Sequence, residues 1–170
     1  CRSRHQDVRR ARGDLPAGDF VLGNPLGGWA SKQWPLEYWE ALGRRLRAEL
    51  SLELVLNAPP QAAALEATRG VRLHTSGLPG LINATRRARL VVGIDSGPLH
   101  LAAALGKPGV ALYGPTDPKR NGPYGGTITV LRNPRAVTSY KRRSVIDPAM
   151  REITPDAVFE ALAARLRGEA

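Results

Sequence analysis

The sequence is poor in features that several protein classes require. One cysteine in 170 residues excludes an internal disulfide and any metal site built from several cysteines. No stretch approaches the roughly 20 consecutive apolar residues of a membrane-spanning helix, and the first residues lack the apolar core of a secretory signal. We therefore expect a soluble domain, and the scarcity of cysteine fits a cytoplasmic location, where thiols stay reduced.

Common catalytic and nucleotide-binding motifs are also missing. The chain has no Gly-x-Ser-x-Gly elbow, no His-Glu-x-x-His pair and no Walker lysine in a Gly-x-x-x-x-Gly-Lys frame. A Gly-x-Gly-x-x-Gly turn is absent after the first predicted strand, at 20–24. These absences argue against a hydrolase, a P-loop enzyme and an ordinary NAD-dependent enzyme.

Positive charge, by contrast, is abundant. The chain has 25 Lys and Arg against 15 Asp and Glu, a formal net charge of +10. Such a surface attracts phosphate groups of nucleic acid, of a nucleotide diphosphate or of an anionic membrane. A basic surface that is merely solvated would have the same composition, so the charge does not choose a partner.

The length predicts one domain, which we place at 19–170. The Arg-rich, polar segment 1–18 is predicted to be a linker or a disordered N-terminal segment. Because the first residue is Cys1 rather than methionine, we expect the chain to be a processed product, an artificial truncation or a fragment, and the motifs described below favour a fragment.

Short apolar segments alternate with segments of helical periodicity along this domain. Strands are predicted at 20–24, 52–56, 71–74, 90–94, 109–113 and 127–131. Helices are predicted at 35–50, 61–69, 79–88, 98–105 and 154–166, the last with Thr154 as its N-cap, and 132–151 is expected to be an irregular loop. Alternating strands and helices imply a doubly wound α/β fold with a parallel sheet.

Ligands of such sheets bind beyond the carboxyl ends of the strands, so the loops that follow the strands are the candidate sites. In the first loop, Gly27 and Gly28 let backbone amides approach a ligand, and Lys32 adds a positive charge just before a helix. This arrangement suits a phosphate group. The alternative is that the glycines only form a turn and that Lys32 is solvated.

The second candidate loop follows the most apolar strand and contains Asp95, Ser96, Gly97 and His100. Asp95 or Ser96 is expected to cap the next helix. The free amides of that first helical turn, with a neutral His100, could hold phosphate or ribose oxygens, although an isolated histidine is often only structural. A third loop, 113–125, either lines the same pocket or only carries the chain across the sheet edge.

Together and in this order, the loops resemble those of glycosyltransferase family 9, the bacterial lipopolysaccharide heptosyltransferases. The residues that carry the resemblance are 27–35 (GGWASKQWP), 90–106 (LVVGIDSGPLHLAAALG), 114–118 (GPTDP) and 122–125 (GPYG), and the similarity extends over about 20–166. It implies a GT-B fold, in which two Rossmann-like domains face each other across a cleft. This chain resembles the C-terminal domain, which binds the nucleotide sugar.

The resemblance also implies a role for each candidate residue. Lys32 and the amides around Gly27 and Gly28 would bind the diphosphate of the donor, ADP-heptose, and Asp95 would contact the sugar or the adjoining phosphate. The remaining residues would hold phosphate oxygens at the helix start: Ser96, Gly97 and His100. The implied reaction is inverting and metal-independent transfer of heptose to a lipopolysaccharide inner-core acceptor, with positive groups stabilising the departing diphosphate.

In the family the catalytic base and much of the acceptor surface belong to the N-terminal domain. We therefore expect no catalytic residue in this chain, and donor binding without efficient transfer. Many relatives carry several cysteines in the stretch that corresponds to 138–150, where this chain has none, which excludes a cysteine-based metal or redox role for that loop. Relatives also often have a glycine-rich turn with an acidic residue near the ribose, where this chain reads NAPPQ at 57–61.

Two rival interpretations remain open at this point. The chain could be the UDP-sugar-binding domain of another GT-B enzyme or of an epimerase. It could also be a basic, non-enzymatic nucleic-acid-binding module, but scattered arginines, an aromatic content of 5% and the lack of a nucleic-acid-binding motif argue against that partner. We expect the charge instead to favour peripheral contact with the anionic inner face of the inner membrane.

Overall fold

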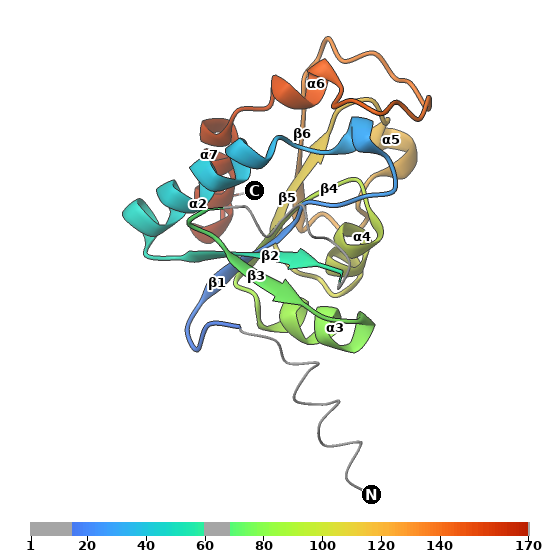
Figure 1. The fold of residues 1–170 in the computed structure, drawn as a ribbon. Helices are drawn as coiled ribbons and strands as arrows, with labels where there is room; N and C mark the ends of the chain where they lie inside the picture. Colours follow the sequence, from blue (N-terminus) through green and yellow to red (C-terminus); the bar gives the residue numbers. More distant parts are fainter. Residues whose placement is uncertain (1–14, 60–68, 170) are drawn as a thin grey trace, which may run out of the picture.

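A six-stranded parallel sheet forms the centre of the computed structural model, which describes residues 15–59 and 69–169 (Figure 1). The sheet order is β3-β2-β1-β4-β5-β6. The strands are β1 (Phe20–Asn24), β2 (Glu53–Ala58), β3 (Arg72–Thr75), β4 (Leu90–Ile94), β5 (Gly109–Tyr113) and β6 (Ile128–Arg132). The predicted α/β, Rossmann-like doubly wound fold is confirmed. The predicted bounds of β1, β4 and β5 are also correct, and those of the other strands differ by one or two residues.

The burial of each strand follows its place in the sheet. Every residue of β1, β4 and β5 is buried, whereas β3 and β6, at the two edges, are partly exposed. A parallel strand covered by helices on both faces has no solvent side, so its sequence is apolar throughout rather than alternating. This is why LVVGI in β4 and GVALY in β5 were sufficient to locate both strands.

Helices cover both faces of the sheet (Figure 1). On one face α2 (Leu36–Leu50) and α7 (Pro155–Leu166) pack against each other and supply large side chains to the core, among them Trp39, Leu46, Phe159 and Leu162. On the other face α3 (Leu78–Arg87) and α4 (Gly97–Ala104) supply mainly small ones, such as Ala84, Ala102 and Ala103. Small side chains bring the start of α4 close to the strand ends.

The helix starts show which capping predictions hold. The Thr154 hydroxyl accepts a hydrogen bond of 3.2 Å from the Ala157 amide, which confirms the predicted cap of α7. Pro35 occupies the N-cap position of α2 rather than its first helical position. No helix in the described ranges is long and apolar enough to cross a membrane.

The expected irregular loop over 132–151 is wrong at its end. There a short helix, α6 (Pro148–Arg151), begins where Asp147 accepts a 2.9 Å hydrogen bond from the Ala149 amide, and it buries Met150 completely. A similar turn, α5 (Pro118–Asn121), lies inside the third candidate loop and is capped by Asp117. Both helices are too short for apolar periodicity to reveal them.

Two predictions fall wholly or mainly outside the described residues. These are the helix predicted at 61–69, of which only Arg69 is described, and the first 14 residues of the segment predicted as a linker. Close to the domain, Leu15 packs against the core cluster on the α3 and α4 face, and the Pro16 carbonyl accepts a 2.6 Å hydrogen bond from Arg87.

Candidate functional site

The candidate residues meet at the edge of the sheet where all the parallel strands end. The strand order reverses there, because the chain proceeds from β1 outward to β2 and β3 and then returns to place β4 on the other side of β1. The connections therefore leave in opposite directions from β1 and β4, which opens a crevice between them. Asn24, at the end of β1, and Asp95, directly after β4, lie at this crevice.

A charged cluster made of Lys32, Asp95 and His100 lies on one side of the crevice, and we call it the Asp95 cluster. The Lys32 ammonium is 3.1 Å from Asp95 Oδ2, and His100 Nε2 is 3.3 Å from Asp95 Oδ1. The Asp95 side chain is 8% exposed, that of Lys32 14% and that of His100 42%. The structure thus brings the lysine and the histidine together on the same carboxylate, although the lysine precedes it by 63 positions.

Local structure fixes the lysine and the glycines that precede it. Lys32 ends a 3-10 turn, η1 (Ala30–Lys32), between β1 and α2. A Cβ on Gly27 would lie 3.1 Å from the Ile94 side chain and 3.6 Å from the Asp95 carbonyl, so the glycine allows this loop to lie directly on the end of β4. A Cβ on Gly28 would meet nothing within 4 Å. Gly27 therefore allows the loop to lie close to the end of β4, while the backbone of Gly28 has open space beside it.

The start of α4 differs from the expectation for its cap. Ser96 occupies the N-cap position, but its hydroxyl is buried and forms no hydrogen bond among the described residues. Asp95 does not cap the helix either, because Lys32 and His100 occupy its carboxylate oxygens. Ser96 is therefore the N-cap residue, as predicted, but its side chain does not form the capping hydrogen bond. Gly97, the first helical residue, is exposed, and a Cβ there would meet nothing within 4 Å.

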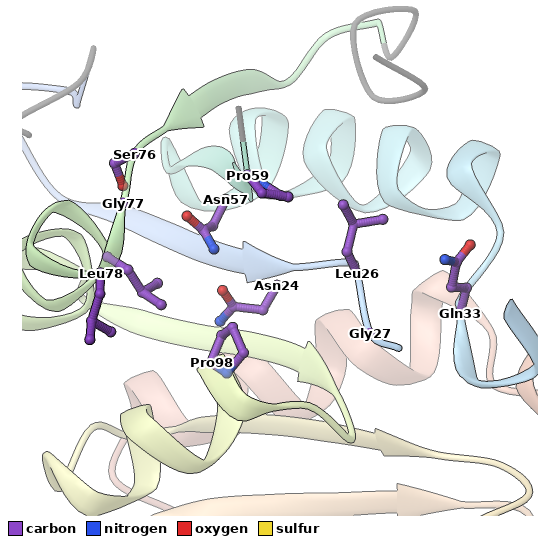
Figure 2. A pocket seen from close by; sticks show the side chains of 11 residues that line it. Asn24, Leu26, Gly27, Gln33, Asn57, Pro59, Ser76, Gly77, Leu78 and Pro98 are labelled. Atoms are coloured by element: carbon purple, nitrogen blue, oxygen red, sulfur yellow. The ribbon is translucent and has the colours of Figure 1, made fainter. Parts of the chain in front are cut away.

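A pocket of about 650 Å³ adjoins the Asp95 cluster on the β1, β2 and β3 side (Figure 2). Much of its wall is apolar: Leu26, Pro59, Leu78, Leu81 and Pro98. Its polar side chains are those of Asn24, Gln33, Asn57 and Ser76. Gly27 and Pro98 connect the pocket with the loops of the Asp95 cluster. We call this cavity the amide pocket.

Several polar atoms of the amide pocket are buried without a partner among the described residues. They are both amide atoms of Asn24, the side-chain carbonyl oxygen of Asn57 and the hydroxyl of Ser76. Asn24 is 1% exposed. Gly23 pairs with Leu56 in the sheet, so the next residues, Asn24 and Asn57, are neighbours, and Figure 2 shows Asn24 next to Pro98 and Asn57 on the Pro59 side of the cavity. Sequence analysis named two parts of this pocket, Gly27 and the stretch 57–61, but missed Asn24, whose local signal was a polar residue at the end of an apolar strand.

On the other side of the Asp95 cluster, aromatic rings and cations form a surface group. The rings of Trp29 and Tyr140 meet edge to face with their centroids 6.5 Å apart. The Arg142 guanidinium lies 5.4 Å from the Trp29 ring, and that of Arg120 lies 5.1 Å from the Tyr140 ring. We call these four residues the cation–aromatic platform. Lys32 joins it to the Asp95 cluster, since its ammonium is 4.7 Å from the Trp29 ring.

The third candidate loop does not line the amide pocket; one of its residues, Arg120, belongs to the platform. At its start the buried Tyr113 hydroxyl donates a 2.6 Å hydrogen bond to the Asn121 carbonyl, which holds α5 against the sheet. Burial, together with the nearby Asp95 carboxylate, raises the pKa of the Tyr113 phenol above its ordinary value. No group of three or more His, Cys, Asp or Glu within 15–59 and 69–169 is arranged to hold a metal ion.

A crevice at the reversal of strand order, with a charged cluster and a pocket along it, is the arrangement of a nucleotide-binding α/β domain. The sequence profile of glycosyltransferase family 9 (heptosyltransferase) matches residues 3–149. The chain belongs to this family, as its motifs predicted.

Comparisons with individual proteins support the same family assignment. Lipopolysaccharide heptosyltransferase 1 of Escherichia coli K12 is 36% identical over 110 residues, which cover 61% of this chain and 34% of that protein. The solved E. coli ADP-heptose lipopolysaccharide heptosyltransferase II superposes with a TM-score of 0.75 at 25% identity, covering 99% of this chain and 53% of that one. E. coli heptosyltransferase WaaC with ADP gives 0.71 at 27% identity, covering 89% and 46%. The chain thus spans about a third to a half of the length of these relatives.

Proposed function

We propose that this domain binds ADP-heptose, with the nucleoside in the amide pocket and the diphosphate between Lys32 and the start of α4. The observation that carries the proposal is the continuity of the amide pocket with the Asp95 cluster through Gly27 and Pro98. A cavity of about 650 Å³ is of the size that drug-sized ligands occupy. Its apolar walls suit a base, and the amide atoms of Asn24 and Asn57 that have no partner among the described residues can pair with the donors and acceptors of the base.

The diphosphate half of the proposal follows from charge and hydrogen-bonding capacity. An ammonium has three donors, so Lys32 can keep its contact with Asp95 and still bind a phosphate oxygen. The first amides of α4 point beyond the strand ends, where the helix dipole favours a negative group. The half-exposed His100 can add a further donor at the same end. The solved WaaC relative contains ADP, which supports an adenine nucleotide as the ligand.

We further propose that the complete enzyme transfers heptose to a lipopolysaccharide inner-core acceptor, with inversion and without a metal ion. Within this domain Lys32 and the α4 amides would stabilise the negative charge that develops on the departing diphosphate. Asp95 is held by Lys32 and His100, so we assign it a positioning role and place the catalytic base in an N-terminal domain. The domain alone would then bind donor but transfer heptose poorly.

The cellular setting is part of the same proposal. A lipid-linked acceptor lies at a membrane, and a domain with net charge +10 would be attracted to an anionic leaflet. We therefore propose a cytoplasmic protein that contacts the inner face of the inner membrane peripherally. Flotation with liposomes that contain or lack anionic lipid tests this, and equal recovery with both would contradict it.

Calorimetry with ADP, UDP, CDP and ADP-heptose tests donor binding. We expect ADP and ADP-heptose to bind best, and both Lys32→Ala and His100→Ala to weaken that binding. Lys119→Ala is the matched control, because this exposed lysine has no contact with the Asp95 cluster. A preference for UDP would favour a UDP-sugar enzyme or an epimerase instead. Unchanged ADP affinity in both variants would remove the site assignment.

A further inference from the structure

The order of the groups along the sheet edge gives the cation–aromatic platform a place in the reaction. The amide pocket lies at the ends of β1, β2 and β3, the Asp95 cluster follows at β4, and the platform lies beyond it toward β5 and β6. If the nucleoside and diphosphate occupy the first two places, as proposed above, the sugar end of the donor and the incoming acceptor reach the third.

The platform carries positive charge that the described protein does not neutralise. Neither Arg120 nor Arg142 has an ion-pair partner in the described part of the chain; their contacts are with the rings of Tyr140 and Trp29. The segment 133–146 contains four cations, Arg135, Lys141, Arg142 and Arg143, and no Asp or Glu. The nearest acids along the chain, Asp117 and Asp147, cap α5 and α6 with their carboxylates.

The segment that carries the platform is held in place at several points. The Ser139 amide donates a 2.7 Å hydrogen bond to the Pro115 carbonyl, and the Asp147 amide donates one of 3.1 Å to the Ser31 carbonyl. Arg132 donates to the Thr138 hydroxyl at 2.9 Å. Tyr140 and Arg142 are thus positioned over Trp29 before any ligand arrives, which lowers the entropic cost of binding.

We propose that the cation–aromatic platform binds an anionic sugar of the acceptor, one that bears a phosphate or a carboxylate. A guanidinium that lies on a ring keeps its N–H edge free, so Arg120 or Arg142 can bind the anionic group through two parallel hydrogen bonds. Sugar C–H groups can then contact the ring surface that the cations leave uncovered. A heptose carries no charge, so the donor sugar gives the free arginines no partner. The anion therefore belongs to the acceptor, whose orientation against the donor the platform would fix.

The test uses this chain saturated with ADP, so that the diphosphate region is filled. Mannose 6-phosphate, glucuronate and mannose are each added to it, and binding is followed by NMR. We expect the anionic sugars to bind in the millimolar range and neutral mannose not to bind. The stronger of the two anionic probes identifies the group as phosphate or carboxylate. Arg142→Gln should weaken sugar binding roughly tenfold, since the variant loses a hydrogen bond between two charged groups. ADP affinity should stay unchanged.

Arg143→Gln is the matched control, because this neighbouring, exposed arginine contacts neither ring. Trp29→Leu should weaken sugar binding as Arg142→Gln does, and the two effects should not add, since one ring supports the other side chain. Equal losses in the Arg142 and Arg143 variants would indicate a diffuse basic surface, such as a contact with anionic lipid, and would overturn the proposal.

Other outcomes would overturn it as well. If Arg142→Gln lowered the affinity for ADP, Arg142 would belong to the donor-binding site. If neither anionic sugar bound, the platform would not be a site for anionic sugars. The failure of the donor proposal would look different, because ADP itself would then not bind. In that case an Arg142-dependent response to a sugar in the nucleotide-free protein would still support the platform.

Discussion

The amide pocket and the Asp95 cluster lie next to each other at one sheet edge, but they differ in whether their buried polar atoms have partners within the described protein. In the cluster, Asp95 is paired at both oxygens, by Lys32 and by His100. In the pocket, the equally buried Asn24 has no partner for either amide atom among the described residues. The charged groups are satisfied within the protein and the neutral ones are not.

The difference indicates how each region meets a ligand. A buried polar group without a hydrogen bond costs about 1–3 kcal/mol, so the pocket sacrifices stability that a bound base could restore. An unpaired buried charge would cost more, and the cluster avoids this by pairing its charges in advance. Binding in the pocket therefore adds new hydrogen bonds, whereas binding at the cluster must use the donors that Lys32 and His100 still have free. The following variants test this contrast, from the largest expected effect to the smallest.

Lys32→Ala should cause the largest loss. The variant removes the cation and leaves the nearly buried Asp95 carboxylate facing the proposed diphosphate region. We expect ADP affinity to fall roughly 100-fold, because truncating one partner of a buried charge pair costs about 2–5 kcal/mol. The double variant Lys32→Ala/Asp95→Asn, measured by calorimetry beside it, should regain part of the loss. No recovery would mean that the Asp95 carboxylate, left without Lys32, is not the cause of the loss.

Asn24→Leu should separate binding from stability. The leucine is similar in volume and removes two unpartnered polar atoms, so the free energy of unfolding in urea should rise by about 1 kcal/mol. ADP affinity should fall roughly tenfold as hydrogen bonds to the base are lost. Thr127→Val is the control: its buried hydroxyl likewise has no partner among the described residues, but it lies before β6, at the opposite sheet edge, so ADP affinity should not change. If the Asn24 variant bound ADP as the wild type does, the pocket would not hold the base.

His100→Ala should have a smaller effect than the lysine variant. The side chain is 42% exposed, so water can replace part of its contact with Asp95 and with a phosphate oxygen. We expect ADP affinity to fall roughly fivefold, the value of one modest hydrogen bond. His100→Gln should restore part of it by calorimetry, because the longer amide still offers a donor. A loss as large as that of Lys32→Ala would instead show that the imidazole carries the phosphate contact.

Tyr113→Phe should barely affect ADP, within about twofold, while costing about 1 kcal/mol of stability through the lost hydrogen bond to Asn121. The raised pKa of the phenol adds a pH dependence. Since the folded protein holds this proton more tightly than the unfolded chain, the wild type should lose stability as the pH rises past about 10, the ordinary tyrosine value. Between neutral pH and pH 11, the free energy of unfolding in urea should fall less in the variant than in the wild type. An identical fall in both proteins would contradict this account.

The sequence predicted the centre of the fold better than its edges. Buried parallel strands such as β1, β4 and β5 need apolar residues at every position, so their bounds are visible in the sequence. The helices α5 and α6 have four residues each and are fixed by a single Asp cap and by tertiary packing, for example of Met150. A window of that length contains no period to detect.

The candidate site was predicted in parts. The loops that carry Lys32 and Asp95 were recognisable by their motifs, but the contact between these residues depends on the sheet order, which joins positions far apart in the chain. Gly27 and the stretch 57–61 were noted, but the amide pocket as a whole was missed because its lining comes from several strand ends and two helix starts that lie far apart in the sequence. In sequence, Asn24 and Asn57 are ordinary polar residues at the ends of strands.

The reversal of strand order also divides recognition between two continuous stretches of chain. Residues 24–81 contribute all of the amide pocket except Pro98, while Asp95, His100 and most of the platform come from residues 95–142. Lys32 and Trp29 also lie in the first stretch, so only its later part is modular: exchange of residues 57–81 could change which base is accepted without altering Lys32, Asp95 or Trp29. Related enzymes could in this way diversify their donors while keeping one transfer chemistry.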